Sequence, residues 1–145
     1  MNNPKPWDYK VKKRWGFWER FWIGVPDNVY MERLSIIWTP WFSIKLHKIF
    51  RADRQEDLHD HPWSFFSIIL HGSYVENTPD GLKKRTIWNW KRATDRHSIR
   101  EVSRSPVWSL VFCGPKIRSW GFWVDDGMGH LEWIKWREYE NLYGA

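Results

Sequence analysis

Two histidines separated by one residue, His59 and His61, carry the clearest chemical signal in this sequence of 145 residues. In an extended strand, residues i and i+2 point to the same face, so both imidazoles can project into one interior. Two neutral imidazoles at that spacing suit a divalent metal ion. Without a metal they would repel each other when protonated, and their burial would cost desolvation. The alternative is a pair of hydrogen-bonded loop histidines beside Pro62.

A third ligand must come from a distant part of the chain, and His97 is the best candidate. It follows a loop-like segment, Arg92–Arg96, and precedes an alternating run, Ser98–Val102. His71 is out of phase with the His59–His61 pair, and His130 lies in a glycine-rich segment. We therefore predict a metal site formed by His59, His61 and His97.

The elements that must position these histidines are short β-strands. From Met31 onward the apolar pattern alternates with a period of two, and turn residues separate the runs. Eight short strands with no helix between them predict an antiparallel sandwich or barrel. The tail Trp133–Tyr143 predicts a last strand and a short helix. The expected strands are Leu34–Trp38, Phe42–Arg51, Ser64–Leu70, Ser73–Glu76, Arg85–Trp90, Ile99–Val102, Val107–Phe112 and Ser119–Val124.

The first thirty residues are expected to form an amphipathic, Trp-rich helix. Val11, Trp15, Trp18 and Trp22 recur at spacings of four, three and four, which is the spacing of one helical face. Asp8 is the expected N-cap, and Gly24 and Pro26 are expected to end the helix. A stripe of this kind suits a membrane surface or the rest of the domain, and we favour packing on the domain. The expected organisation is a single domain, with a helical extension at 1–30 and a barrel at 31–145.

Composition narrows the classes of protein that remain. The 14 tryptophans supply enough apolar area to fill a core, which excludes a disordered chain. The single cysteine, Cys113, excludes an internal disulfide and a cysteine-based zinc finger, and it favours a cytoplasmic location. No apolar run approaches the roughly 20 residues of a membrane span. The net charge of +6 favours anionic partners.

The spacing of these residues resembles the first cupin motif, G-x5-H-x-H-x3,4-E-x6-G. His59, His61 and Gly72 occupy its histidine and closing glycine positions, whereas Phe65 stands in the glutamate position and Asp53 in the leading glycine position. Of the second cupin motif only the histidine is kept, at His97. The resemblance covers roughly residues 43 to 124, and a wider pattern over residues 39 to 122 is similar to small cupin-like proteins of bacteria and phages.

The resemblance implies a jelly-roll barrel, the double-stranded β-helix of the cupins, holding one divalent metal ion. Cupins with three histidines and no glutamate resemble thiol dioxygenases, so the implied metal is Fe(II), with Zn, Ni or Mn as alternatives. Three neutral imidazoles leave the ion at a charge of +2, which favours an anionic co-ligand. The implied activity is a non-haem iron dioxygenase acting on a small anionic substrate.

Further residues are candidates for contact with substrate or metal. Tyr74 and Glu76 share one strand face and are the expected catalytic residues, with Glu76 able to replace the missing carboxylate ligand. The expected substrate-binding residues are His47, Arg51, Phe65 and Arg118, with Phe65 as an apolar wall that keeps water from the metal. For each polar candidate the alternative is an outward-facing solvated side chain.

Two other function classes compete with the dioxygenase. A non-redox cupin could bind or isomerise a metabolite or a sugar. A nucleic-acid-binding barrel is suggested by the aromatic and basic residues of segment 84–92, in which Trp88 and Trp90 share a face. We favour the small-molecule interpretation over nucleic acid. The resemblance to cupins, which often dimerise through strand edges, implies a possible homodimer.

Overall fold

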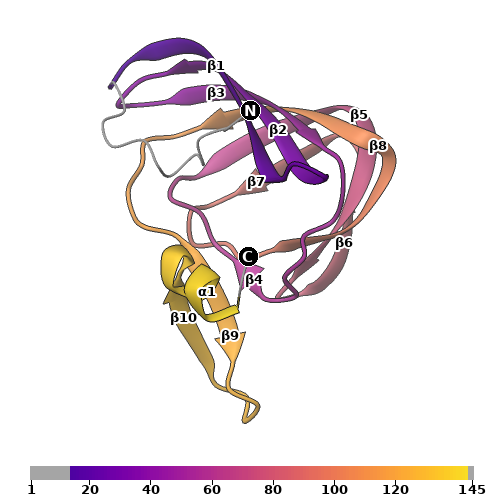
Figure 1. Cartoon of the computed structure of the whole chain (residues 1–145), viewed down its shortest axis with the longest axis vertical. Helices are drawn as coiled ribbons and strands as arrows, with labels where there is room; N and C mark the ends of the chain where they lie inside the picture. The colour runs from indigo at the N-terminus through magenta and orange to yellow at the C-terminus, as the bar shows by residue number, and fades with distance from the viewer. Residues whose placement is uncertain (1–13, 144–145) are drawn as a thin grey trace.

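The computed structural model describes residues 14–143 and consists mainly of β-strands with one short C-terminal helix (Figure 1). Alternation of buried and exposed residues along the strands matches the period-two pattern of the sequence. The elements are β1 (Gly16–Val25), β2 (Asn28–Trp38), β3 (Ser43–Ile49), β4 (Leu58–His59), β5 (Phe65–Thr78), β6 (Gly81–Arg85), β7 (Trp88–Lys91), β8 (Ser98–Cys113), β9 (Gly121–Asp125), β10 (Leu131–Lys135) and α1 (Trp136–Tyr143).

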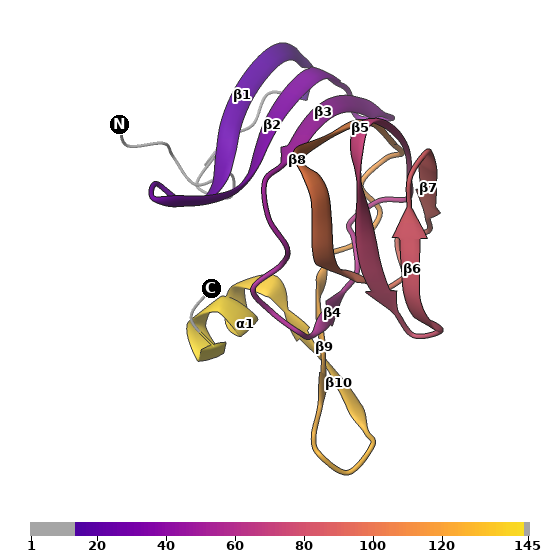
Figure 2. The ribbon, with the colours of Figure 1, turned by 90° about the vertical axis from the view of Figure 1, so that its right-hand side faces the viewer.

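The strands form two antiparallel sheets. The larger sheet has the order β1-β2-β3-β8-β5-β6, with β7 also paired to β5, and the smaller sheet has the order β10-β9-β4. The large sheet curls around itself, and the smaller sheet lies at the end from which the β9–β10 hairpin and α1 project (Figure 2). The predicted β-rich barrel architecture is thus confirmed. So is the expectation that the tail forms a strand and a short helix.

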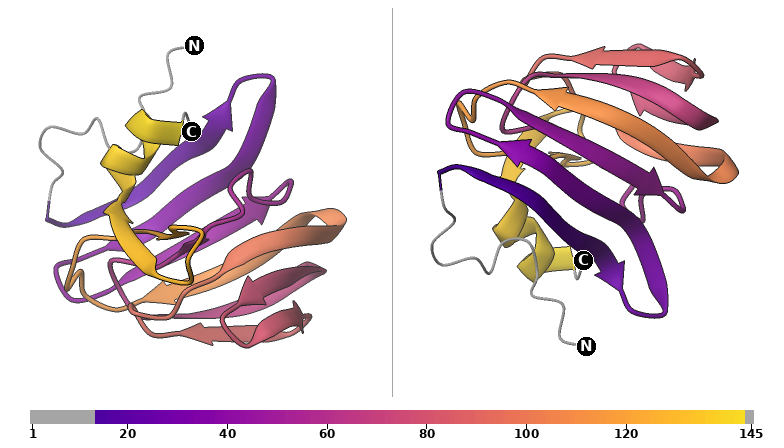
Figure 3. Two further views of the ribbon diagram at one scale, coloured as in Figure 1. Left: turned by 90° about the horizontal axis from the view of Figure 1, so that it is seen from below. Right: turned by 90° about the horizontal axis from the view of Figure 1, so that it is seen from above.

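The N-terminal helix was a wrong expectation. Residues 16–25 form β1, which pairs along its length with β2 in the large sheet (Figure 3). Phe21 is buried, and Trp15 and Trp18 are half or more exposed, so the aromatic stripe does not cover the barrel as a helix would. Val11 and Asp8 lie outside the described residues. The expected division at residue 30 falls inside β2.

Two long strands each replace a pair of short ones that the sequence predicted. β5 continues through Gly72, which has a φ of 77°, and its pairing with β8 shifts register on both sides of this residue. A Cβ atom on Gly72 would lie 2.8 Å from the carbonyl oxygen of Ser103, so the bend requires a glycine. The turn residues at these points therefore bend strands instead of ending them.

The interior of the large sheet is apolar at one end and polar towards the other. Met31, Ile49, Tyr74, Ile99 and Val107 belong to the apolar cluster. A second, smaller cluster packs α1 onto the hairpin, where the ring of Tyr139 stacks on Phe122 at 3.9 Å between centroids. No helix within residues 14–143 is long and apolar enough to cross a membrane.

Candidate metal centre

Backbone pairing brings two of the three predicted ligands together. His59 ends β4, and His97 lies just before β8; the two residues form an isolated antiparallel bridge with both N–H···O bonds at 3.0 Å. The N–H of His61 donates to the carbonyl of Ala93 at 3.0 Å, which fixes the third histidine against the loop that leads to His97. The site is thus positioned by main-chain hydrogen bonds between segments almost forty residues apart in sequence.

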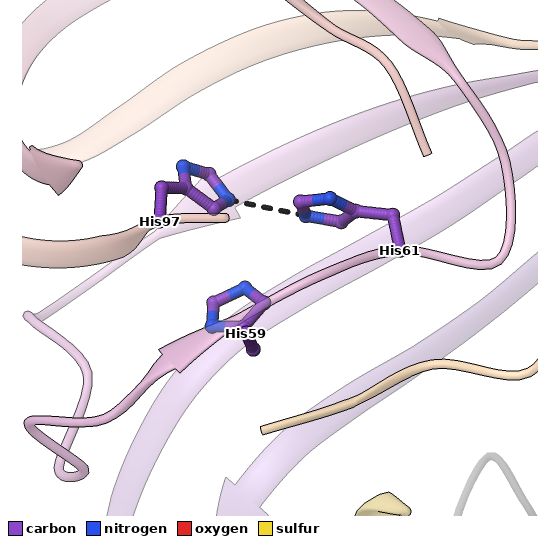
Figure 4. Close-up of side chains that lie close together, drawn as sticks. All are labelled: His59, His61 and His97. Carbon is purple, nitrogen blue, oxygen red and sulfur yellow. Dashed lines mark hydrogen bonds between the residues drawn. The ribbon is translucent and has the colours of Figure 1, made fainter. Parts of the chain in front are cut away.

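The three imidazole rings face one another (Figure 4). The ring centroids of His59 and His61 are 5.3 Å apart, and that of His97 lies 4.9 Å from each of them. The Nε2 atoms of His61 and His97 are 3.1 Å apart. One ring nitrogen from each histidine lies within 4.8 Å of the others. The predicted trio therefore converges on one point.

The environment keeps two of these rings neutral. Burial, followed by the charge of His97, lowers the pKa of His59 to about 4. Burial and the neighbouring histidines lower the pKa of His61 well below its usual value. A neutral imidazole offers a lone pair, so these rings have the protonation state that a metal ligand requires.

Glu76 contacts His97 on the side away from the other two histidines. Its side chain is fully buried, and its Oε2 accepts a hydrogen bond from Nδ1 of His97 at 2.7 Å. Because a carboxylate can only accept, this bond places a proton of His97 on Nδ1, and the Nε2 atom of His97 points towards His61. Such a carboxylate–histidine pair orients and polarises a metal ligand.

Two cations and an amide surround the same carboxylate. The ammonium of Lys91 lies 2.6 Å from Oε1 of Glu76, and the guanidinium of Arg85 lies 2.8 Å from the same atom. Asn89 donates to Oε2 at 3.1 Å. Burial raises the pKa of Glu76, but the bonds from His97 and Lys91 outweigh it and hold this pKa well below the usual range. The carboxylate is therefore ionised.

Sequence reasoning missed Lys91, Asn89 and Arg85 as partners of the site. They lie in segment 84–92, which the sequence connected with nucleic acid binding. The alternation of residues along β7 was the signal that could have assigned Asn89 and Lys91 to one face of the strand and Trp88 and Trp90 to the other. Asn89 and Lys91 point inwards and are buried, whereas Trp88 and Trp90 point outwards and are about half exposed.

Asp60 lies between the two histidines of the motif and points the opposite way. Its carboxylate accepts bonds from the backbone N–H of Gly121 at 2.8 Å and from the indoles of Trp123 and Trp133 at 3.1 and 3.0 Å. Arg118 forms an ion pair with it at 2.8 Å and donates to the carbonyl of Ala93 at 3.2 Å. Arg118 thus sits behind the trio, where it supports the backbone.

The other residues singled out in the sequence fall at different distances from the trio. The ring of Phe65 lies 4.9 Å from that of His61 and 6.4 Å from that of His97, so it forms one wall of the centre. Tyr74 accepts a bond from Asn89 at 2.9 Å, and burial raises its pKa to about 12. His47 lies on the inner face of β3, next to Arg33. Arg51 donates to backbone carbonyls of Ala52 and Asn28.

The donor set fits a divalent metal ion. Two nitrogen atoms bound to one ion at about 2.1 Å each lie roughly 3 Å apart, which matches the separation of the His61 and His97 Nε2 atoms. The Nδ1 of His61 is buried without a hydrogen-bond partner, as happens when the position of a ring is set by another requirement. Imidazole donors suit Fe(II), Zn and Ni, and the trio does not select among these three ions, whereas Mn prefers oxygen ligands.

Comparison with solved structures identifies the fold. The chain is similar to an RmlC-like cupin of Shewanella frigidimarina, with a TM-score of 0.52, 13% identity and coverage of 79% of this chain and 95% of the other. It is also similar to Streptomyces PAC13 in complex with uridine, with a TM-score of 0.53, 12% identity and coverage of 88% and 98%. The predicted resemblance to cupins is confirmed at the level of the fold.

The extent of similarity differs among the matched structures. The chain covers 65% of the polyketide cyclase RemF of Streptomyces resistomycificus, at 16% identity and a TM-score of 0.49. No protein-family model matches the sequence, and the search of curated proteins finds no match. The similarity to the RmlC-like cupin and to PAC13 shows the cupin fold, in which the three-histidine centre lies.

Proposed function

We propose that this chain is a metal-binding cupin in which His59, His61 and His97 hold one divalent metal ion. The observation that carries the proposal is the convergence of one ring nitrogen from each histidine within 4.8 Å. Its support is the neutral state of His59 and His61 and the buried carboxylate behind His97. A bound cation would offset the desolvation cost of burying three imidazole rings together.

The finer proposal is a non-haem Fe(II) dioxygenase acting on a small anionic substrate. The ligand atoms of the trio include no carboxylate, because Glu76 faces the far side of His97 and Phe65 occupies the glutamate position of the motif. The ion would thus keep its charge of +2, which favours an anionic substrate as co-ligand. When bound, ferrous iron would supply the open coordination positions at which substrate and O₂ meet.

The protein's own residues have distinct parts in this proposal. Glu76 would fix the tautomer of His97, and Tyr74 would hold Asn89 in the network around that carboxylate. Phe65 would exclude water from one side of the centre. Arg118 would act through the backbone of the His61 loop, since its guanidinium already pairs with Asp60.

A non-redox cupin is the second candidate. The observation that favours it is the similarity to PAC13, whose structure contains uridine and thus shows a cupin fold that binds a nucleoside. Oxygen consumption by the Fe(II)-loaded protein in the presence of candidate substrates separates the two, because only a dioxygenase consumes O₂.

The nucleic-acid alternative is tested by salt. Binding of single-stranded nucleic acid by Trp88 and Trp90 would weaken steeply as the salt concentration rises.

The metal content of the protein after anaerobic purification tests the proposal. We expect about one divalent ion per wild-type chain, and loss of most of it in His59→Ala and His97→Ala. His71→Ala is the matched control, because His71 is exposed and lies away from the trio. Equal metal content in the wild type and both trio variants, measured by elemental analysis, would contradict the proposal.

Two further expectations stay predictions. A cytoplasmic location rests on the single cysteine, which is free and buried. A homodimer is supported by the exposed apolar side chains on the outer face of the large sheet, which include Ile68, Trp88 and Trp90.

A further inference from the structure

One row of residues, polar except for Val111, crosses the interior of the large sheet. Strand register places Glu19 of β1 opposite Ser35 of β2, Ser35 opposite Lys45 of β3, and Lys45 opposite Val111 of β8. The row continues from Val111 to Ser67 of β5 and from Ser67 to Asn89 of β7. Asn89 contacts Glu76, so the row ends at the carboxylate that holds His97.

A second row beside it contains a partly buried guanidinium, that of Arg33. Phe21, Arg33, His47 and Ser109 are opposite one another across four strands. Arg33 donates from Nε to Nε2 of His47 at 2.9 Å, and its guanidinium lies over the ring of Phe21. Among the described residues, no carboxylate lies within ion-pair distance of Arg33. Burial lowers the pKa of Arg33 and, together with the charge of Arg33, that of His47.

Lys45 brings a second positive charge to the same interior. Its side chain is 5% exposed, and its ammonium lies 3.6 Å from the ring of Trp63. Trp63 is two residues from His61, and two residues span at most about 7 Å of extended chain. Lys45 therefore lies next to the segment of chain that carries His61.

Polar atoms without partners lie next to these cations. Ser35 is 1% exposed, and its Oγ has no hydrogen-bond partner. Oε1 of Glu19, the residue opposite Ser35, is also buried without a partner. Buried polar atoms in native proteins are nearly always bonded to protein, water or ligand. A hydroxylated ligand would satisfy both atoms, because a hydroxyl group donates and accepts.

We propose that Arg33, Lys45, Ser35 and Glu19 form the binding subsite for the substrate, a small hydroxylated organic anion whose carboxylate or phosphate lies between Arg33 and Lys45. The inference deepens the proposed function and rests on it only in identifying the bound anion as the substrate. A guanidinium and an ammonium are the side chains that recognise an anionic oxygen group. Hydroxyls next to that group would reach Ser35 and Glu19.

Binding of four related probes to chelator-treated protein tests the subsite. The probes are glycerate, glycerol phosphate, propionate and glycerol. Glycerate and glycerol phosphate compare a carboxylate with a phosphate, propionate lacks the hydroxyl groups of glycerate, and glycerol lacks the anionic group. At constant ionic strength we expect saturable binding of glycerate or glycerol phosphate, weaker binding of propionate, and none of glycerol. Calorimetry measures the affinity.

Matched variants assign the affinity to the named residues. Lys45→Met and Arg33→Met should each weaken the better anion about tenfold or more, and Ser35→Ala about threefold. Lys48→Met and Arg20→Met are the controls, because Lys48 pairs with Glu32 and Arg20 is exposed on the outer face. Arg33→Lys, which keeps the charge, should retain part of the binding if Arg33→Met fails to fold.

The outcomes distinguish this inference from the proposed function. No saturable binding of either hydroxylated anion to the wild type would overturn the subsite, and so would equal affinity in the wild type and Lys45→Met. Anion binding by a protein that takes up no metal would overturn the proposed function and leave the subsite standing. Tighter binding of propionate than of glycerate would overturn the hydroxyl contacts with Ser35 and Glu19.

Discussion

The metal trio is the part of the site that residue types and spacing could predict. His59, His61 and Gly72 match the first cupin motif, the period-two pattern predicted a β-rich chain, and His97 was the best candidate for the third ligand. The role of Glu76 as the hydrogen-bond partner of His97 could not be predicted in the same way. A carboxylate can contact a metal directly or through a histidine, and only the orientation of the His97 ring distinguishes the two.

Removing the charge of Glu76 tests its link to His97. We expect Glu76→Gln to weaken metal binding about 10- to 100-fold, because the amide no longer holds the proton of His97 on Nδ1 as strongly. The variant also leaves Lys91 and Arg85 without their shared anion, so it should be less stable to urea by several kcal/mol, roughly 3–5.

A double variant separates these two effects. Glu76→Gln combined with Lys91→Met removes both members of a buried ion pair, so part of the lost stability should return while metal affinity stays low. Metal affinity is measured by competition with a chelator. Unchanged affinity in Glu76→Gln would show that His97 needs no carboxylate partner.

The neutral histidines make the stability of the metal-free protein depend on pH. The pKa of His59 is about 4 in the fold and about 6.5 in an unfolded chain, so the unfolded state binds more protons in this range. The contribution of the neutral His59 ring to the free energy of unfolding is fully present above pH 6.5, and it is lost as the pH falls towards 4. Since one pKa unit corresponds to about 1.4 kcal/mol, His59 alone should account for roughly 3 kcal/mol.

Urea unfolding in the presence of a chelator at pH 7.5, 6 and 5 measures this dependence. The free energy of unfolding should fall with each step, and His59→Gln should flatten the profile because glutamine does not titrate. A wild-type profile that is flat from pH 7.5 to 5 would contradict the neutral, buried state of these rings.

At the scale of the elements, strand type was predictable and the N-terminal element was not. Trp15, Trp18 and Trp22 satisfy a helical spacing, yet Phe21 and Ile23 in the same segment also satisfy an alternating one. Pairing with β2 decides between them, and pairing is a long-range property that a local pattern does not contain. The same reason explains why β5 and β8 each run through residues that signal turns.

Asp60 joins the smaller sheet to the metal loop, so its removal should loosen that sheet. Asp60→Ala leaves two indole N–H groups and the guanidinium of Arg118 without their acceptor. We expect a loss of roughly 3–5 kcal/mol in the free energy of unfolding, measured with urea. Asp80→Ala is the control, because Asp80 lies exposed at the tip of the β5–β6 hairpin. Equal stability of the two variants would contradict this role.

At the scale of the molecule, the large sheet encloses polar residues at one end of its interior and exposes apolar side chains on its outer face. Its outer face exposes Ile68, Leu70, Trp88, Trp90 and Phe112. Exposed apolar surface of this kind marks contact with another macromolecule, and we predict that the contact is a second copy of the chain. The composition alone could not show this, because a count of tryptophans does not say which face of a strand they occupy.

Sedimentation velocity tests the predicted dimer. Ile68→Lys places a charge in the middle of the outer face and should convert a sedimenting dimer into a monomer without loss of bound metal. Met128→Lys is the control, since Met128 is exposed in the β9–β10 loop, away from this face. A wild-type protein that sediments as a monomer at all concentrations would refute the dimer.

The bridge between His59 and His97 has a mechanical consequence for the whole barrel. One of these residues belongs to the small sheet and the other leads into the large one, so an ion bound to both would cross-link the two sheets. Such a link acts on the folded state alone, because the unfolded chain does not hold the three rings together. The melting temperature should therefore climb with the logarithm of free metal concentration once that concentration exceeds the dissociation constant.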